Sequence, residues 1–481
     1  MDQRVETLIR ERNYIDGAWT GEGKLVVTNK ATGEAIAKVP MMGAKETKAA
    51  IDAANAALPA WSKKTAKERC NLMRAWYNLI IENTDKIAAI ITAEQGKPLA
   101  EAKGEVAYAA SFIEFFAEEA KRIRGETIPT FKNDARVVCI KQPVGVVAAI
   151  TPWNFPAAMI TRKAGPALAV GCTMVLKPAS ETPLTALALA ELAHQAGIPK
   201  GVFNVITGKA SIIGAELTSN PTVRMLTFTG STEIGKQLIS ECAKTVKKVG
   251  MELGGNAPFI VFDDADLDKA VAGAMMSKYR NAGQTCVCAN RIYVQDSVYD
   301  KFAEKLAVEV KKLKMGNGAD DGVTTGPLIN KAAVEKVEEH IADALAKGAK
   351  IVVGGKRHKL GGNFFEPTIM TGVSSDMKVA REETFGPVAP LFRFKTEDEV
   401  IKLANDTEFG LASYFYSRDI GRVWRVGEAL EYGIIGINEG IISSELVPFG
   451  GMKESGLGRE GSHHGVEEFL EVKYMLMGGV S

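Results

Sequence analysis

Two cysteines separated by a single residue occur in the stretch NAGQTCVCAN, which covers residues 281–290. Cys286 and Cys288 are two of only six cysteines among 481 residues. A thiolate is a strong nucleophile, so a cysteine here is a candidate for covalent catalysis. Free cysteines also serve as small buried hydrophobic residues, and this stretch alone leaves both alternatives open.

The elements that must position such a nucleophile are helices and short apolar strands. Residues 45–120 have the apolar spacing of helices, and residues 121–142 combine a turn signal with a β-rich run, which predicts a hairpin or an extended arm. From Val144 onward, strands alternate with helices. We expect strands within residues 144–152, 172–178, 203–208 and 224–230.

The same alternation of helices and strands returns over residues 253–430, and the tail 467–478 is again β-rich. Strands buried on both faces and separated by helices are typical of parallel sheets. The sequence therefore predicts an α/β protein with two doubly wound α/β domains and a small β extension.

Composition excludes several classes of function. The net charge is +1, 24% of the residues are charged, and there is no basic run that would indicate binding to nucleic acid. The apolar runs are far shorter than the roughly 20 residues of a membrane span. The scattered cysteines and the charged N-terminal stretch fit a cytoplasmic protein without structural disulfides.

Two glycine-rich stretches are candidates for phosphate binding. The motif G-x-G-x-x-G at 456–461 follows no predicted strand and opens no βαβ unit, so it is a weak signal and more typical of a flexible loop. In TFTGSTEIGK (227–236) a strand runs into Gly230 and Ser231, and a helix follows. The free N–H groups of that helix favour an anion, although an ordinary turn capped by Ser231 or Thr232 fits equally well.

Six separated motifs together resemble the aldehyde dehydrogenase superfamily, in its order and spacing and over essentially the whole chain. They are TPWNFP (151–156), VLKPAS (175–180), TFTGSTEIGK, MELGGNAP (251–258), GQTCVC (283–288) and EETFGPV (382–388). Three longer stretches are most similar to the succinate-semialdehyde dehydrogenases of that superfamily: MITRKAGPAL (159–168), YRNAGQTCVC (279–288) and ISSELVPFGGMKESGLGREG (442–461).

The resemblance implies a domain organisation. It assigns a dinucleotide-binding domain to residues 1–120 and 143–251, and a catalytic domain to 252–435. Residues 436–461 return to the cofactor domain and the mouth of the active site. Residues 121–142 and 462–481 form a β extension that pairs between subunits, so we expect a homo-oligomer, either a dimer or a tetramer.

The resemblance also assigns the catalytic groups. Cys286 matches the nucleophile that forms a thiohemiacetal and then a thioester. Asn154 matches the amide that stabilises the oxyanion together with the backbone N–H of Cys286. Glu252 matches the general base that activates water. Because relatives that transfer the acyl group to coenzyme A usually lack this glutamate, its presence favours hydrolysis to the free acid.

The same resemblance implies a nicotinamide cofactor. Lys177 matches a residue that hydrogen-bonds the adenosine ribose. Ser180 stands where NAD-specific members often carry a glutamate, so NADP is expected to be accepted as well as NAD, although the neighbouring Glu181 works against this. The full set of expected cofactor contacts is Thr151, Trp153, Lys177, Ser180, Gly214, Gly230, Ser231, Glu383 and Phe385.

Substrate choice is expected to depend on two arginines. Arg162, Arg280 and Ser444 match residues that hold the substrate carboxylate, and a guanidinium suits this task because it binds a carboxylate bidentately. Ser443 is an alternative to Ser444, and an ordinary surface ion pair is the alternative for each arginine. His463 and His464 lack metal-ligand spacing, so no metal site is expected.

The expected reaction is the NAD(P)-dependent oxidation of succinate semialdehyde to succinate. Glutarate semialdehyde or another short carboxylated aldehyde is the alternative, since one methylene changes binding by only about 1–3 kcal/mol. A non-catalytic member of the fold is a further alternative, but such a protein is expected to lack Cys286, Glu252 or Asn154.

Cys288 is expected to be a redox partner of Cys286. In an extended segment, residues two apart face the same side with Cα atoms roughly 6.6 Å apart, near the upper limit for a disulfide. The bridge would be strained and easily reduced, and would act as a reversible switch. The alternative is that Cys288 is a buried residue with no redox role.

Overall fold

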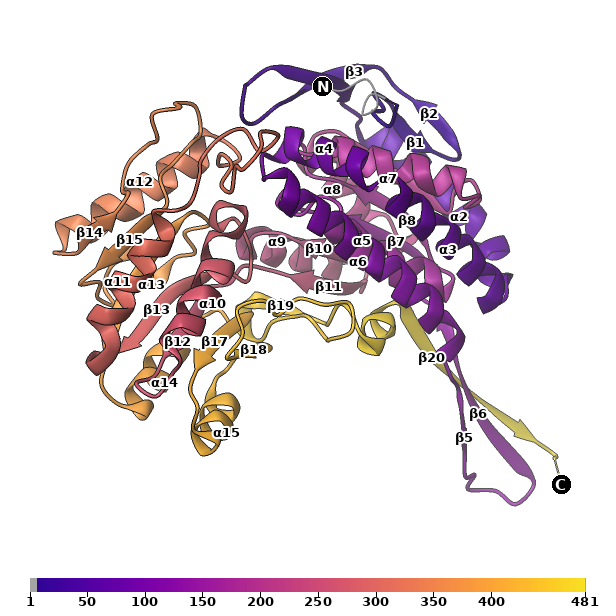
Figure 1. Ribbon diagram of the computed structural model, residues 1–481. Coiled ribbons are helices and arrows are strands. Elements are labelled where there is room, and N and C mark those ends of the chain that lie inside the picture. Colours follow the sequence, from indigo (N-terminus) through magenta and orange to yellow (C-terminus); the bar gives the residue numbers. More distant parts are fainter. Residues whose placement is uncertain (1–6, 481) are drawn as a thin grey trace.

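The computed structural model describes residues 7–480 and contains two α/β lobes and a projecting arm (Figure 1). The first lobe is built on an eight-stranded sheet. In spatial order its strands are β19 (Gly456–Leu457), β11 (Lys248–Glu252), β10 (Val223–Thr229), β7 (Val146–Ile150), β8 (Thr173–Lys177), β9 (Phe203–Val205), β1 (Asn13–Ile15) and β2 (Ala18–Thr20).

The five central strands of this sheet, β11 to β9 in spatial order, are parallel. The chain runs outward from β7 through β8 to β9 and then returns to the other side of β7 with β10. This reversal creates a topological switch point between β7 and β10. In open α/β sheets, ligands bind outside the carboxyl ends of the strands at such a point.

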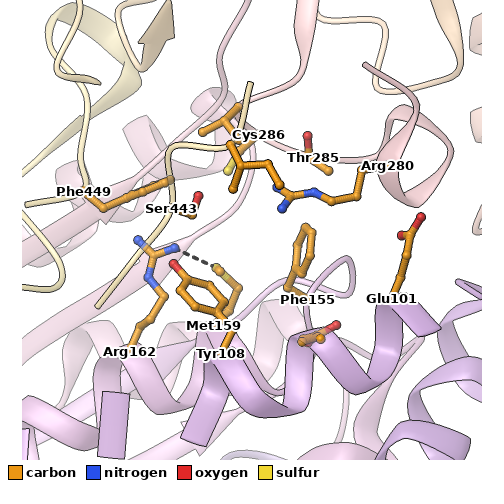
Figure 2. Close-up of a pocket in the computed structure, with 14 residues that line it drawn as sticks. Glu101, Tyr108, Phe155, Met159, Arg162, Arg280, Thr285, Cys286, Ser443 and Phe449 are labelled. Carbon is orange, nitrogen blue, oxygen red and sulfur yellow. Dashed lines mark hydrogen bonds between the residues drawn. The ribbon is translucent and has the colours of Figure 1, made fainter. Parts of the chain in front are cut away.

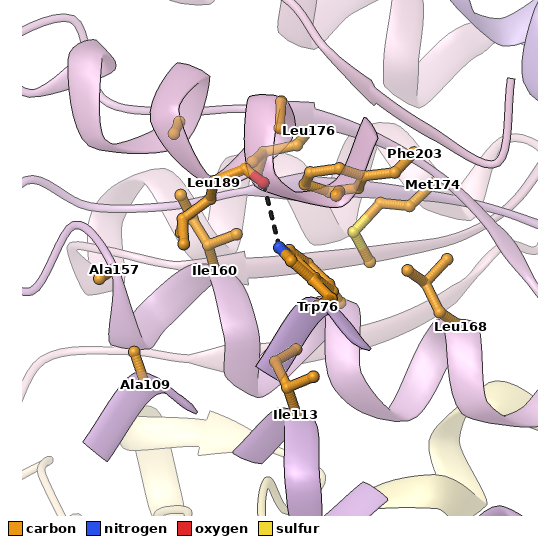
Figure 3. Close-up of a cluster of buried hydrophobic side chains, with 14 of the residues drawn as sticks. Trp76, Ala109, Ile113, Ala157, Ile160, Leu168, Met174, Leu176, Leu189 and Phe203 are labelled. Carbon is orange, nitrogen blue, oxygen red and sulfur yellow. Dashed lines mark hydrogen bonds between the residues drawn. The ribbon is translucent and has the colours of Figure 1, made fainter. Parts of the chain in front are cut away.

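Helices cover this sheet, and the predicted helical region 45–120 is confirmed as four of them. The lobe contains α2 (Ala44–Lys63), α3 (Ala66–Glu82), α4 (Thr84–Gln95), α5 (Leu99–Glu119), α6 (Ala158–Val170), α7 (Pro183–Gln195), α8 (Ala210–Ser219) and α9 (Thr232–Ala243). The apolar faces of α3, α5, α6 and α7 meet around Trp76, whose indole N–H donates to the backbone oxygen of Leu189 at 3.1 Å (Figure 3). The large ring thus fills the core without leaving a polar atom unpaired.

The second lobe is built on a seven-stranded sheet. Its strands in spatial order are β14 (Lys350–Val353), β15 (Thr368–Thr371), β16 (Val388–Phe394), β13 (Ala289–Gln295), β12 (Ala257–Val261), β17 (Ala412–Tyr416) and β18 (Ile434–Ile437). All neighbours are parallel except the edge strand β14. Its helices are α10 (Leu267–Tyr279), α11 (Tyr299–Val310), α12 (Lys331–Ala346), α13 (Lys378–Arg381), α14 (Glu397–Asn405) and α15 (Ile420–Ala429).

The arm consists of β5 (Glu126–Ile128), β6 (Ala135–Pro143) and β20 (Leu470–Gly478), and it extends away from both lobes (Figure 1). Strands β6 and β20 are antiparallel and paired from Leu470 opposite Pro143 to Gly478 opposite Ala135. The hairpin or extended arm predicted for residues 121–142 and the β tail predicted for 467–478 are therefore confirmed, and they form one sheet.

Two further strands, β3 (Gly23–Thr28) and β4 (Ala35–Pro40), form a separate antiparallel pair near the start of the chain. Over residues 7–480, none of the helices combines the length and the apolar character needed to cross a bilayer.

Candidate active site

The residues singled out in the sequence meet where the edges of the two sheets face each other. Asn154, Lys177, Gly230 and Glu252 follow or end the parallel strands β7, β8, β10 and β11 at their carboxyl ends. Because parallel strands bring their carboxyl ends to one edge, four motifs far apart in sequence share this edge. In the second sheet, Cys286 precedes β13 and Glu383 precedes the neighbouring strand β16.

Two cavities meet at Cys286, and both are also lined by Met159. The first has a volume of about 290 Å³ and lies against α5, α6 and the loop after β18 (Figure 2). Its lining includes Tyr108, Phe155, Arg162, Arg280, Thr285, Ser443 and Phe449. The second, of about 240 Å³, is lined by Trp153, Asn154, Gly230, Ser231, Leu253, Lys336, Glu383 and Phe385, among others.

The loop that carries Cys286 has an unusual backbone. Asn281 and Ala282 have positive φ angles of 51° and 54°, and Gly283 follows with 76°. Consecutive left-handed residues cost energy and persist only when the surroundings hold them. Here the amide of Asn281 donates to the backbone oxygens of Asn154 (3.1 Å) and Gln284 (3.2 Å), so the strained turn joins the nucleophile loop to the loop after β7.

Asn154 lies next to this turn and is almost fully buried. Its side-chain Nδ2 donates to the backbone oxygen of Gln284 at 3.1 Å, two residues before Cys286. Its own backbone oxygen accepts from the Nζ of Lys97 at 2.8 Å. The side-chain amide is therefore fixed from both ends beside the nucleophile, as an oxyanion donor requires.

Lys97 is held in turn by a buried carboxylate. Its Nζ pairs with Glu105, and both side chains are 1% exposed. The other oxygen of Glu105 accepts from the backbone N–H groups of Ala157 (2.8 Å) and Ala158 (3.3 Å) at the start of α6. Every polar atom of this ion pair thus has a partner, which offsets the cost of burying two charges.

The surroundings of Cys286 favour the protonated thiol in the absence of substrate. Burial raises its pKa to about 12, while the positive charges of Arg162 and Arg280 act in the opposite direction. A thiol in an apolar cavity is a poor nucleophile until nearby positive charge stabilises the thiolate.

Cys288 differs from the expectation that it follows Cys286 in an extended segment. Residues 285–288 form a turn closed by a 3.1 Å hydrogen bond from the N–H of Cys288 to the oxygen of Thr285. The buried Cys288 thiol lies against Lys278, with Nζ at 3.4 Å from Sγ, and lines neither cavity. The expectation of an extended segment was wrong because strand β13 begins only at Ala289, after this turn.

Glu252 is buried at the end of β11, and its carboxylate lines neither of the two cavities. It lies in a small space shared with Arg459 and Glu460. Burial and the negative charge of Glu460 raise its pKa well above the usual range, and its Oε2 has no hydrogen-bond partner in the described part of the chain. A base in this position must rotate its side chain to reach a water molecule at Cys286.

Glycines give the Glu252 carboxylate its room. A Cβ on Gly450 would lie 3.0 Å from Oε1 of Glu252 and 2.7 Å from the backbone oxygen of Gly458. A Cβ on Gly456, which has a φ of 148°, would lie 2.1 Å from the backbone oxygen of Met251. The G-x-G-x-x-G stretch begins with the short strand β19, which pairs with β11. Within the described residues, no helix of a βαβ unit follows it.

Arg162 is not a surface arginine. It is 2% exposed, and its Nε lies 2.9 Å from Glu460, which also pairs with Lys163. Its guanidinium lies over the ring of Phe449, 3.9 Å from the centroid, and its Nη2 has no hydrogen-bond partner within the described residues. Part of its hydrogen-bonding capacity therefore remains available to a ligand in the first cavity.

Arg280 enters the same cavity from the other lobe. Its guanidinium lies 5.4 Å from the ring centroid of Phe155, and its buried Nε has no hydrogen-bond partner over residues 7–480. Of the two serines considered for the carboxylate, Ser443 lines the cavity, whereas the hydroxyl of Ser444 donates to Glu445 at 3.2 Å.

The second cavity has the features of a dinucleotide site. Trp153 and Phe385 form one wall, with their rings edge to face and their centroids 5.5 Å apart. Burial raises the pKa of Glu383 to about 7. Ser231 is the N-cap of α9 but makes no capping hydrogen bond through its side chain, so the first N–H groups of this 12-residue helix are not capped. Of the two interpretations of this turn, the geometry favours the anion site.

The remaining expected cofactor contacts lie along the same sheet edge, outside the lining of the two cavities. Thr151 follows β7, and its N–H donates to the backbone oxygen of Lys177 at 3.2 Å. Lys177 is buried, and burial lowers its pKa. Ser180 follows β8 and is half-buried. Gly214 lies on α8, where a Cβ would have open space around it.

Four residues of the site were not identified from the sequence: Lys97, Glu105, Tyr108 and Lys336. Lys336 lines the second cavity from α12. The other three lie in or just before α5, a segment that carries no sequence motif. A signal existed for Glu105, since it occupies the apolar stripe formed by Ala102, Val106 and Ala109, where an unpaired charge would be costly.

Comparison with known proteins identifies relatives of this chain. The model of the aldehyde dehydrogenase family matches residues 19–475. The NADP(+)-dependent succinate-semialdehyde dehydrogenase of Escherichia coli K12 is 68% identical over 98% of each chain. A glutarate-semialdehyde dehydrogenase of Pseudomonas aeruginosa is 67% identical over 100% of each chain.

The fold agrees with this relationship. A crystal structure of an NADP-dependent enzyme from E. coli superposes with a TM-score of 0.98 at 68% identity, covering 98% of this chain and 99% of that one. The resemblance inferred from six motifs and the predicted α/β architecture are both confirmed. The chain belongs to the aldehyde dehydrogenase family.

Proposed function

We propose that this enzyme oxidises succinate semialdehyde to succinate with NADP or NAD as the cofactor. The observation that carries the proposal is the first cavity, in which two guanidinium groups, those of the buried Arg162 and the half-buried Arg280, face a space that ends at Cys286. Each has a buried N–H without a partner among the residues that the structure describes. Such groups are costly unless a ligand pairs with them, and a carboxylate is the natural partner.

The reaction begins at the sulfur of Cys286. The thiol gives its proton to solvent water, and the positive charges of Arg162 and Arg280 stabilise the thiolate. The thiolate attacks the aldehyde carbon, a C–S bond forms, and the carbonyl oxygen becomes an oxyanion beside the amide of Asn154 and the backbone N–H of Cys286. The chemistry supplied by a bound nicotinamide ring is the acceptance of a hydride. Loss of the hydride leaves a thioester on Cys286.

Hydrolysis of the thioester needs a base. Glu252 is within electrostatic reach of Cys286, since its charge acts on the pKa of that thiol. After rotation, its carboxylate takes a proton from water, the water oxygen attacks the thioester carbon, and the C–S bond breaks. The free acid leaves, and the thiolate returns. The raised pKa of Glu252 means that this step becomes faster as the pH rises.

The second cavity and the adjoining sheet edge fit the cofactor. The uncapped start of α9 would offer N–H groups to the pyrophosphate, Trp153 and Phe385 would contact the nicotinamide ring, and Glu383 with Lys336 would hold the nearby ribose. Ser180, in place of an acidic side chain, leaves the 2′-phosphate of NADP unopposed by charge at that position. The NADP(+)-dependent relative from E. coli supports this assignment.

Glutarate semialdehyde is a second candidate substrate, and the relative from P. aeruginosa favours it. Kinetic constants for a panel of aldehydes with each cofactor, measured from the absorbance of reduced nicotinamide, distinguish the two candidate substrates. We expect the highest kcat/KM for succinate semialdehyde and a much lower one for butanal, which has the same length and no carboxylate. Equal values for these two substrates would contradict the proposed function.

A homo-oligomer, either a dimer or a tetramer, is proposed on the basis of the arm. Strand β20 is an edge strand of the arm sheet, and Val472 and Tyr474 on it are each 68% exposed. An exposed edge with apolar side chains is a template for pairing with another strand. Light scattering after size-exclusion chromatography tests this proposal, since a mass of one chain would contradict it.

A redox role for Cys288 is also proposed. Oxidation of Cys286 to a sulfenic acid by a peroxide, followed by attack of the Cys288 thiol with loss of water, forms a disulfide. The Cys288 side chain has to leave Lys278 for this to happen.

All six cysteines are free thiols in the structure, which supports a reducing cytoplasm as the compartment of the enzyme.

A further inference from the structure

Tyr108 is the one tyrosine that lines the first cavity, and no sequence motif points to it. It lies on α5, and Figure 2 shows it beside Arg162 and Met159. Its hydroxyl oxygen is buried and has no hydrogen-bond partner among residues 7–480. A buried hydroxyl without a partner costs free energy of the order of 1–3 kcal/mol, so a ligand that pairs with it gains correspondingly.

The position of Tyr108 is fixed by packing. Its ring contacts Phe112 edge to face, with centroids 4.9 Å apart. The same Phe112 ring lies 5.6 Å from the guanidinium carbon of Arg162. One aromatic side chain therefore supports both donors, the hydroxyl of Tyr108 and the guanidinium of Arg162, on the same side of the cavity.

The charges around the cavity suit an anion at this end. Arg162 and Arg280 act on Tyr108, and burial raises the pKa of its phenol, so it remains a proton donor at neutral pH. Each nearby carboxylate has a partner in the protein: Glu460, which also acts on Tyr108, is paired with Arg162 and Lys163. Glu105 is paired with Lys97, and Glu101, which accepts from the N–H of Asn281 at 2.8 Å, lies across the cavity from Tyr108 and Arg162 in Figure 2.

We propose that the Tyr108 hydroxyl donates a hydrogen bond to the distal carboxylate of the substrate and is a specificity-determining residue of this enzyme. It forms one donor set with Arg162 and Ser443, which line the same cavity. The hydroxyl has no role at the aldehyde carbon, so it contributes to the choice of substrate and leaves the chemistry at Cys286 unchanged. This inference rests on the proposed oxidation of a carboxylated aldehyde.

The test is Tyr108→Phe, which removes one oxygen atom and keeps the ring against Phe112. Because a hydrogen bond to a charged group is the stronger kind, we expect KM for succinate semialdehyde to rise about tenfold or more, with kcat changed little. KM for butanal should stay near its wild-type value. Inhibition of butanal oxidation by succinate should weaken by the same factor as the rise in KM, which measures carboxylate binding without any reaction of the acid.

Tyr77→Phe is the matched control, since Tyr77 lies on α3 of the same lobe and lines neither cavity. It should leave all these constants unchanged. Equal changes for succinate semialdehyde and butanal, or no change for either, would overturn the role of Tyr108. Failure of the proposed function itself is distinguishable, because then the wild type would already show no preference for succinate semialdehyde over butanal.

Discussion

The Nζ of Lys97 donates to the backbone oxygen of Asn154 at 2.8 Å, and neither residue is exposed by more than 5%. This contact joins the oxyanion donor to a buried ion pair with Glu105, whose second oxygen holds the first N–H groups of α6. The loop after β7 is thus fixed by charges that lie far away in sequence and take no part in the reaction.

We expect Lys97→Met to lower kcat about tenfold or more, because displacing an oxyanion donor costs part of the roughly 10²–10³-fold effect of removing it. The substitution also leaves Glu105 unpaired, so the melting temperature should fall. The double variant Lys97→Met/Glu105→Gln removes the unpaired charge and should regain stability more than kcat. Lys48→Met, which breaks an exposed pair with Asp52, is the control and should change neither. A normal kcat in the single variant would contradict the positioning role.

Glu252→Gln separates the two halves of the reaction. Acylation of Cys286 should continue and deacylation should stall, which gives a burst of about one reduced cofactor per active site and then slow turnover. Rapid mixing with absorbance detection measures the burst. In the wild type, the deacylation rate should rise with pH, because the raised pKa keeps Glu252 protonated at lower pH. Normal turnover without a burst would exclude Glu252 as the base.

Much of this arrangement could be predicted from the sequence, and the exceptions have physical reasons. Short apolar runs such as Val146–Ile150 predict parallel strands correctly, because a strand buried on both faces leaves this pattern. The roles of Glu105 and Tyr108 could not be predicted from the helical repeat, because these roles depend on contacts with residues of other elements. The orientation of the Cys288 side chain depends on the turn at 285–288, which the sequence TCVC does not predict.

In the substrate-free enzyme, the Cys286 thiol should lose its proton only at high pH. Burial raises its pKa to about 12, so its thiolate fraction should increase about tenfold per pH unit from pH 7 to pH 10. Iodoacetamide labelling followed by peptide mass spectrometry at Cys286 measures this rate separately from the other cysteines. A free cysteine would instead level off above a pH of roughly 8.5. A plateau there would show that Arg162 and Arg280 outweigh burial.

Arg280→Glu tests whether Arg280 binds the substrate carboxylate, because it replaces an attraction with a repulsion in the cavity. We expect KM for succinate semialdehyde to rise about a hundredfold or more, with a much smaller change for butanal. Arg357→Glu is a suitable control, since Arg357 is exposed, pairs with Glu338 and lines neither cavity. Equal losses for the two aldehydes would show that Arg280 supports the loop at 281–283 and does not bind the carboxylate.

Cys288→Ala tests the proposed redox switch. Peroxide should inactivate the wild type through a Cys286–Cys288 disulfide, and a dithiol reductant should restore activity. The variant lacks a resolving thiol, so its Cys286 should pass on to sulfinic acid, which the reductant cannot restore. Since Cys288 now lies against Lys278, formation of the disulfide requires the turn at 285–288 to open, and it should be slower than the first oxidation of Cys286. Intact mass follows the wild type, where the disulfide appears as the loss of two hydrogens. Equal recovery of both proteins, or an unchanged wild-type mass, would leave Cys288 as a buried residue held by Lys278.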